Sequence, residues 1–129
     1  MNQITLNTIE DYISSNPPAF LSSHKKLSLP IIRRIHKKMC IGIKFDDIKV
    51  CDGIIIDGHH RYISSLLASY TIGQVSSNKT SATVPCEWTT VEFVDEEWDT
   101  EAKIAEINRQ DAEYNGVELE ILIEMTNNS

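Results

Sequence analysis

The sequence has few cysteines and no apolar run long enough to cross a membrane. Its three cysteines, Cys40, Cys51 and Cys86, form no CxxC pair, which argues against a disulfide framework and against a zinc ribbon. The N-terminus lacks the basic patch and long apolar stretch of a secretory signal. No segment approaches the ~20 apolar residues of a membrane span. We therefore expect a protein of the reducing cytoplasm that contacts no membrane.

Positive charge is scarce in the second part of the chain. Residues 1–80 hold ten Lys and Arg against six Asp and Glu, a balance of +4. Residues 81–129 hold two against thirteen, a balance of −11. Nonspecific binding of nucleic acid needs a broad basic surface, and the net charge of −7 opposes it. The charge therefore argues against a nucleic-acid partner and leaves room for a local anion site in the first part.

The length and composition indicate one globular domain over residues 1–129. Hydrophobic residues make up 41% of the 129 residues and charged residues 24%, which is typical of folded domains. No repeat or low-complexity tract divides the chain, and its only proline pair is Pro17-Pro18. We expect an α+β fold in which a small mixed sheet with a hairpin is flanked by helices.

Two helices are expected in the first 41 residues. The spacing of Asn7 and Glu10 matches a capping box, which predicts a helix over 7–15. Ser28 as N-cap predicts another over 29–41. The apolar stripe of this second helix is Ile31, Ile35 and Met39. Its lysines and arginines are expected in solvent, with a cationic wall beside an anionic ligand as the alternative.

The most regular pattern in the chain is a hairpin. Two β-branched runs, 48–51 and 54–56, are separated by Asp52-Gly53, the preferred two-residue turn. We expect Ile54 and Ile56 to be buried. The patterns that follow predict, in order, a helix over 59–70, an exposed loop over 73–82, a strand over 84–94, a helix from Thr100 to before Gly116, and a half-buried strand over 117–125.

One motif combines several groups that bind anions: the Asp57-Gly58-His59-His60-Arg61 segment directly after the second hairpin strand. A helix that begins here offers free backbone N–H groups and the positive end of its dipole. Gly58 allows close approach of a ligand, while His59, His60 and Arg61 add donors, of which Arg61 in particular matches a phosphate. Asp57 could hold Mg²⁺ or accept a proton. The motif predicts a phosphate site.

A purely structural explanation competes with this one. Asp57 could cap the helix, with Gly58 in a tight turn and both histidines on the surface. Charged His59, His60 and Arg61 would oppose the helix dipole, which favours an anion that neutralises them. His24 and His36 are isolated and are expected to be surface or core residues, and the cysteines are expected to be small buried side chains.

The segment Val50–Tyr62, VCDGIIIDGHHRY, resembles the xxIxDGHHRxxA stretch of ParB-like domains, whose superfamily also contains sulfiredoxin and a free-serine kinase. The resemblance covers about residues 28–94 and leaves an acidic extension, 95–129, predicted as a helix and a strand. It implies a ParB/sulfiredoxin-like fold that binds ATP or CTP with Mg²⁺. By position it places Gly58, His60 and Arg61 at the phosphates, and Asp57 and His59 near the metal or the reacting group.

The sequence departs from the family in three ways. Sulfiredoxin has its reactive Cys at the place of His59, so its repair chemistry is not expected here. DNA-partition members continue into a helix-turn-helix domain, and this chain has only the acidic extension. The family's kinases use a carboxylate nearer the N-terminus, and none stands between Asp11 and Asp46. In a kinase, the general base that activates the acceptor hydroxyl would have to be Asp46, Asp47, Asp57 or an acidic residue of the extension.

Two hypotheses of function remain. The first is a nucleotide-binding enzyme that performs phosphoryl transfer, or hydrolysis of a nucleotide or phosphodiester, at the DGHHR loop. The second is a non-catalytic interaction or immunity-type protein whose acidic region 95–125 binds a basic protein partner.

Overall fold

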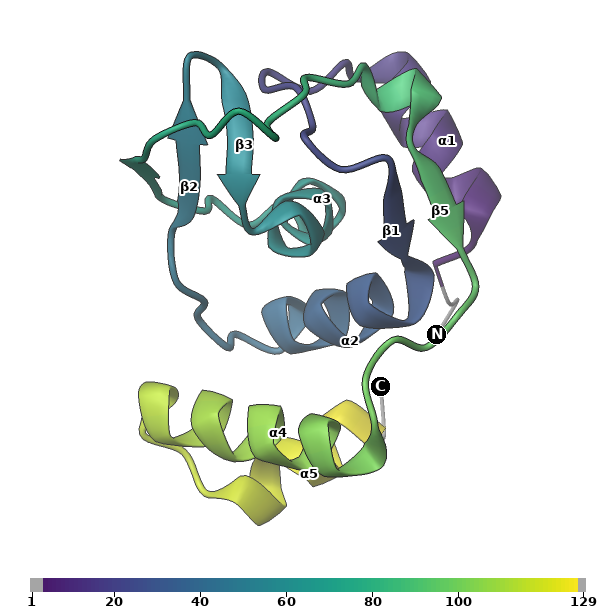
Figure 1. Ribbon diagram of the computed structural model, residues 1–129. Helices are drawn as coiled ribbons and strands as arrows, with labels where there is room; N and C mark the ends of the chain where they lie inside the picture. Colours follow the sequence, from purple (N-terminus) through teal and green to yellow (C-terminus); the bar gives the residue numbers. More distant parts are fainter. Residues whose placement is uncertain (1–3, 128–129) are drawn as a thin grey trace.

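The computed structural model describes residues 4–127 and confirms the α+β class. Its elements, in chain order, are α1 (Leu6–Ser15), β1 (Lys26–Ser28), α2 (Leu29–Cys40), β2 (Ile48–Cys51), β3 (Ile54–Asp57), α3 (His59–Ala68), β4 (Gln74–Ser76), the 3-10 turn η1 (Trp88–Thr90), β5 (Glu92–Val94), α4 (Glu101–Asn115) and α5 (Leu119–Asn127). In Figure 1, α3 lies between the hairpin and the β1–β5 pair, and α2 separates this part from α4 and α5.

The strands of the described residues form two small sheets. In the first, β2 lies between β3, to which it is antiparallel, and β4, to which it is parallel. The second is the parallel pair of β1 and β5, two segments far apart in the sequence (Figure 1). This mixed first sheet with its hairpin agrees with the expectation from the sequence.

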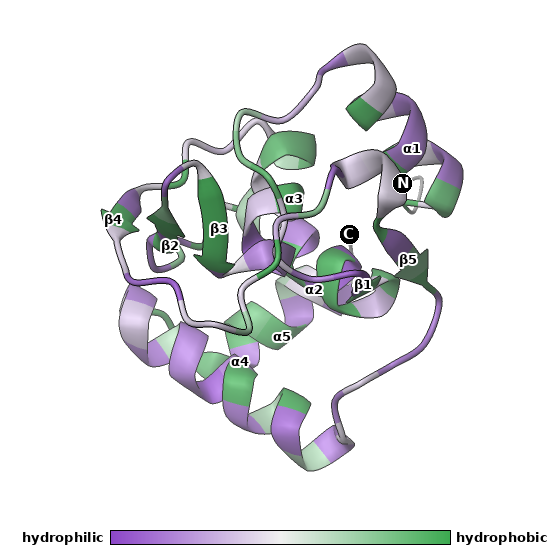
Figure 2. Cartoon of the chain, turned by 45° about the horizontal axis from the view of Figure 1, so that its top comes forward, coloured by the Kyte–Doolittle hydropathy of each residue, from purple (hydrophilic) through white to green (hydrophobic). Residues whose placement is uncertain are grey.

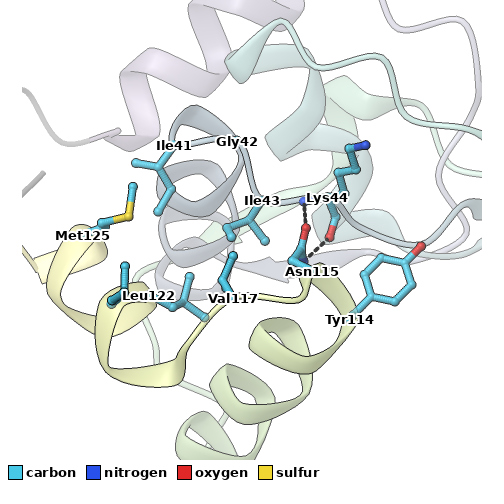
Figure 3. Close-up of a pocket in the computed structure, with 10 residues that line it drawn as sticks. Ile41, Gly42, Ile43, Lys44, Tyr114, Asn115, Val117, Leu122 and Met125 are labelled. Carbon is cyan, nitrogen blue, oxygen red and sulfur yellow. Dashed lines mark hydrogen bonds between the residues drawn. The ribbon is translucent and has the colours of Figure 1, made fainter.

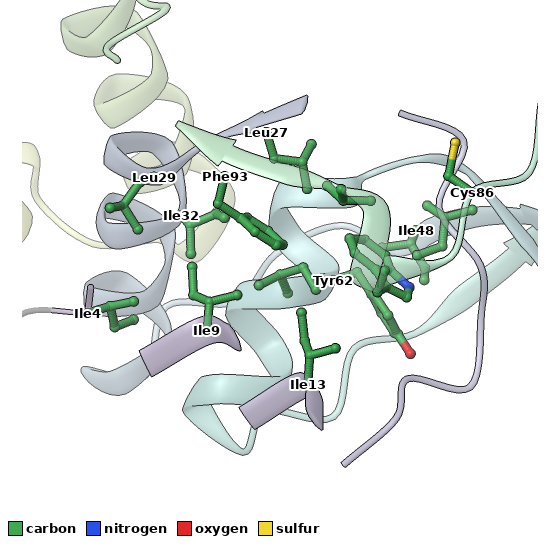
Figure 4. Packing of buried hydrophobic residues seen from close by; sticks show 14 residues of the cluster. Ile4, Ile9, Ile13, Leu27, Leu29, Ile32, Ile48, Tyr62, Cys86 and Phe93 are labelled. Atoms are coloured by element: carbon green, nitrogen blue, oxygen red, sulfur yellow. The ribbon is translucent and has the colours of Figure 1, made fainter. Parts of the chain in front are cut away.

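The main core fills the space between the sheets and helices α1, α2 and α3. Its members come from almost every element, as the packing in Figure 4 shows: Ile9, Ile13, Leu27, Leu29, Ile32, Ile48, Ile55, Tyr62, Ile63, Trp88 and Phe93 are all buried. Along β3, Ile54 and Ile55 are buried and Ile56 is partly exposed, which corrects the expected pair of Ile54 and Ile56. Figure 2 shows β3 as one of the most hydrophobic segments.

Several local predictions are confirmed. Asp52 and Gly53 adopt positive φ angles of 50° and 77°, as the hairpin turn requires. The Ser28 side chain accepts a hydrogen bond from the Ile31 amide at the start of α2. At the start of α1 the prediction was wrong, because Thr5, paired with Thr8, forms the capping box in place of Asn7.

Two segments between residues 73 and 94 differ from the prediction. The expected loop contains β4, whose three side chains are all exposed. β4 forms because backbone groups bond to the free edge of β2, for instance the Ser77 amide to the Val50 carbonyl at 2.8 Å. The expected strand over 84–94 is only the three-residue β5, preceded by η1, and Trp88 and Phe93 of this segment are buried.

The last element is a helix, α5, where a half-buried strand over 117–125 was expected. Gly116, with φ of 64°, ends α4 and reverses the chain direction. The returning segment packs against α4 and α2, away from both sheets (Figure 1). A segment without a neighbouring strand can still pair its backbone N–H and C=O groups with one another as a helix.

Candidate functional site

The N-terminus of α3 carries the DGHHR motif and has no side-chain cap. Within the described chain, Gly58 is the N-cap residue and no side chain accepts a hydrogen bond from the first turn. The first helical bond joins the Tyr62 amide to the Gly58 carbonyl at 2.8 Å. The preceding amides therefore point out of the helix end, where they attract an anion. The explanation that Asp57 caps this helix is excluded.

The backbone conformation at residue 58 requires a glycine. Its φ of +95° is one that residues with a side chain rarely adopt. A Cβ atom here would lie 2.8 Å from Ile48 Cγ2 and 2.8 Å from Arg61 Nη2. The glycine thus allows the turn from β3 into α3 as well as a close approach by a ligand.

A cavity of about 220 Å³ opens at this helix end, and we call it the α3 pocket. It is lined by His24, Ile31, Ile35, Asp57, Gly58, His59, His60 and Arg61. All five motif residues predicted from the sequence meet here, as consecutive residues of a tight turn must. His24 was not predicted to line this pocket, and Ile31 and Ile35, which were predicted on the apolar stripe of α2, line it as well.

His59 is buried, with 2% of its surface exposed. Its Nε2 lies 3.1 Å from the Ser23 backbone N–H, which donates to it, and the ring stacks on His24 with centroids 3.9 Å apart. Burial, reinforced by the neighbouring His24, lowers the pKa of His59 to about 3. His59 therefore stays neutral and holds the segment around Ser23 against α3.

His60 is also held by the backbone. Its Nε2 accepts a hydrogen bond from the Ser28 amide at 3.0 Å, and Trp98 meets its ring edge-on at a centroid distance of 5.5 Å. Burial, followed by the influence of His24, lowers the pKa of His60 to about 4. The interpretation that both histidines are charged is therefore wrong, and so is the alternative that placed both on the surface, because His59 is buried and His60 is only partly exposed. Arg61 is the one cation of the motif.

Arg61 and Asp57 lie together at the edge of the α3 pocket. Arg61 Nη2 donates to the Asp47 carbonyl at 3.2 Å and lies 3.7 Å from Asp57 Oδ2. Arg61 Nε is buried and has no hydrogen-bond partner among the described residues. The Asp57 side chain is 62% exposed. The guanidinium therefore keeps a donor for a further acceptor, and Asp57 is the accessible carboxylate.

The residues present fit a metal ion only in part. Residues 4–127 contain no group of three or more His, Cys, Asp or Glu that could hold a metal. Mg²⁺ is often held by one or two carboxylates together with the phosphates of a substrate. Asp57 fits this arrangement as the single protein ligand.

The basic face of α2 binds the acidic segment that follows β5. Arg34 donates to the carboxylates of Glu97 and, at 2.9 Å, Asp99. Arg33 donates to the Ile4 carbonyl at 2.7 Å and lies 3.5 Å from Asp95. The prediction that these cations lie in solvent was wrong, because they satisfy carboxylates of the same chain.

The other carboxylates considered as a base lie outside the α3 pocket. Asp46 accepts a hydrogen bond from Tyr114 of α4, which raises the pKa of that phenol, and it lines a separate cavity of about 280 Å³. The Asp47 side chain lies against Gly73, where a Cβ would be 2.0 Å from Asp47 Oδ1. Asp57 is the only one of the three that lines the α3 pocket.

Comparisons with protein-family models, with curated proteins and with solved structures found no match to this chain. The family resemblance of the DGHHR segment therefore remains a prediction. No helix within residues 4–127 combines the length and the apolar character needed to cross a membrane.

Proposed function

We propose that the chain binds the phosphate groups of a nucleotide, ATP or CTP with Mg²⁺, in the α3 pocket. The uncapped N-terminus of α3 supports this best, because the residues of its first turn and Arg61 line the same pocket. A pocket of about 220 Å³ is smaller than usual ligand cavities. It fits the phosphates, so the base and ribose would lie on the surface outside.

The reaction proposed for this site is phosphoryl transfer, or hydrolysis of a nucleotide or phosphodiester. Such reactions depend mainly on positioning and on neutralising charge. Arg61 and the first amides of α3 orient the phosphate, and Asp57 accepts the proton of the attacking group. His59, whose Nε2 is already engaged by Ser23, orients the loop. Mg²⁺ held at Asp57 and the phosphates would supply neutralising charge.

Thermal melting with and without ligand tests the binding. ATP or CTP with Mg²⁺, at about 100 times its dissociation constant, should add ~2.7 kcal/mol to the free energy of unfolding. Inorganic triphosphate should also stabilise the protein, whereas adenosine and cytidine should not. If neither nucleotide nor triphosphate raises the melting temperature, the proposal fails.

Release of phosphate or of a cleaved phosphodiester product tests the chemistry. The Asp57→Asn variant should keep triphosphate binding and lose turnover, since the amide cannot accept the proton. An equally active Asp57→Asn protein would remove Asp57 from the mechanism without affecting the binding proposal.

A further inference from the structure

A larger, more apolar cavity lies at the other end of α2, where α4 and α5 pack against it. We call it the α5 groove; its volume is about 570 Å³. It is lined by Ile41, Gly42, Ile43, Lys44, Tyr114, Asn115, Val117, Ile121, Leu122 and Met125. Figure 3 shows Ile41 and Ile43 on one side, facing Val117, Leu122 and Met125 on the other. None of these residues lines the α3 pocket.

The α5 groove exposes more apolar surface than the fold needs. Five of the nine exposed large hydrophobic side chains in the described chain lie on the α4–α5 segment: Tyr114, Val117, Ile121, Ile123 and Met125. The core beneath them has only three buried members, Ile43, Ala112 and Leu122. Side chains two residues apart on a helix differ by about 200° around the helix axis. The alternating apolar residues of α5 therefore cannot all face this small core. Clustered exposed apolar surface marks an interaction site.

Free negative charges stand beside the α5 groove. Glu118, Glu120 and Glu124 are exposed and form no ion pair within residues 4–127. On α4, by contrast, Glu106 and Glu113 are both paired with Arg109. The carboxylates of Glu118, directly before α5, and of Glu120 and Glu124 on α5 are thus available to a cationic partner.

We propose that the α5 groove binds an amphipathic, cationic helix of a partner protein. The apolar face of that helix would fill the groove, and its lysines or arginines would pair with Glu118, Glu120 and Glu124. The charge favours this occupant over a second copy, because a symmetric pair would place the same carboxylates opposite each other. Nucleic acid and anionic lipid are repelled for the same reason. The proposal does not depend on the phosphate site.

A synthetic peptide pair probes the groove of the whole chain. One peptide carries leucine at i, i+3, i+4 and i+7 with lysine elsewhere, and the other replaces every lysine by glutamate. Fluorescence anisotropy should show binding of the lysine peptide, weakening as salt rises, and no binding of the glutamate peptide. The double variant Ile121→Ser, Met125→Ser should bind the lysine peptide roughly tenfold more weakly.

Two further variants separate the contribution of charge to peptide binding from that of the apolar groove. Changing Glu118, Glu120 and Glu124 to Gln should weaken binding and remove most of its salt dependence. The double variant Val75→Ser, Val84→Ser also loses exposed apolar side chains, but outside the groove, and should bind normally. The proposal is overturned if the lysine peptide does not bind, if the glutamate peptide binds equally well, or if the control variant loses as much affinity. It is also overturned if the chain sediments as a dimer that Ile121→Ser, Met125→Ser abolishes.

Discussion

Lys38 of α2 donates a hydrogen bond of 2.7 Å to the carboxylate of Asp111 on α4, and only 5% of the Lys38 side chain is exposed. Removing one partner of such a pair leaves a buried charge without compensation. Asp111→Ala should therefore lower the free energy of unfolding by about 3 kcal/mol in urea titrations. The double variant Lys38→Met, Asp111→Leu should recover most of this loss. A double variant no more stable than Asp111→Ala would show that the charge is not the cause.

The pairing of Arg34 with Glu97 and Asp99 predicts that the acidic segment contributes to stability. Changing Glu97 and Asp99 together to Ser should lower the free energy of unfolding by about 1 kcal/mol, the upper end for partly exposed pairs. Glu96→Ser is the matched control, because Glu96 directly precedes Glu97, is exposed and forms no ion pair within the described residues. Equal melting temperatures for both variants would contradict a stabilising role of the ion pairs.

Alanine substitutions at two glycines, one in the hairpin and one directly after it, distinguish the cost of backbone strain from the cost of a steric clash. Gly53 and Gly58 both have positive φ, but a Cβ at Gly53 meets nothing within 4 Å. Gly53→Ala should cost about 1 kcal/mol for the left-handed conformation alone. Gly58→Ala should cost clearly more, because its Cβ would press on Ile48 and Arg61. Urea denaturation of the two variants gives the comparison, and equal costs would contradict the predicted clash.

Arg61→Ala should weaken the binding of inorganic triphosphate about ten- to a hundredfold, because it removes a charge-assisted hydrogen bond. Isothermal titration calorimetry with inorganic triphosphate measures this affinity. Lys79→Ala is the control, since Lys79 pairs with Asp52 at the far end of the hairpin. If Lys79→Ala weakens triphosphate binding equally, Arg61 contributes only general charge.

Stability should fall as the pH falls from 6.5 toward 5. The folded-state pKa values of His59 and His60, about 3 and 4, lie below the value near 6.5 of an unfolded chain. The unfolded state therefore binds more protons in this interval, at a cost of up to ~1.4 kcal/mol per pH unit for each histidine. His60→Gln, whose amide oxygen can still accept from Ser28, should reduce the slope. An unchanged slope in urea titrations would contradict the low pKa of His60.

The sequence was most informative where one or two residues determine the local conformation. The Asp52-Gly53 turn, the Ser28 cap and the Gly116 end of α4 were all predictable, because each depends on a backbone angle or a cap within a few residues. The capping box at Thr5 was missed because Asn7 offered the same pattern two residues later.

Elements determined by distant neighbours could not be predicted. β4 has three exposed side chains and thus no hydrophobic pattern, and the edge of β2 determines its conformation. The alternation over 117–125 is typical of a strand, yet α5 lies where no strand is available to pair with it. Tertiary context overrides such patterns.

The candidate site was predictable only as far as it is continuous in sequence. Residues 57–61 meet because they form one turn, whereas His24 comes from a separate segment with no characteristic spacing. The burial of His59 and the partial burial of His60 are likewise not encoded in the motif. The opposite charges of the two parts of the chain were interpreted as a local anion site and a partner surface, whereas in the structure Arg34 pairs with Glu97 and Asp99 of the same chain.

The parallel pairing of β1 with β5 has a consequence for biosynthesis. A ribosome must release the chain beyond residue 94 before β1 finds its partner and before Trp88 and Phe93 can join the core. Until then the apolar faces of α1 and α2 remain open to chaperones and to aggregation. Closing so long a loop also slows folding relative to proteins with mainly local contacts. The nascent protein is therefore expected to gain its stability only after β5 has emerged from the ribosome.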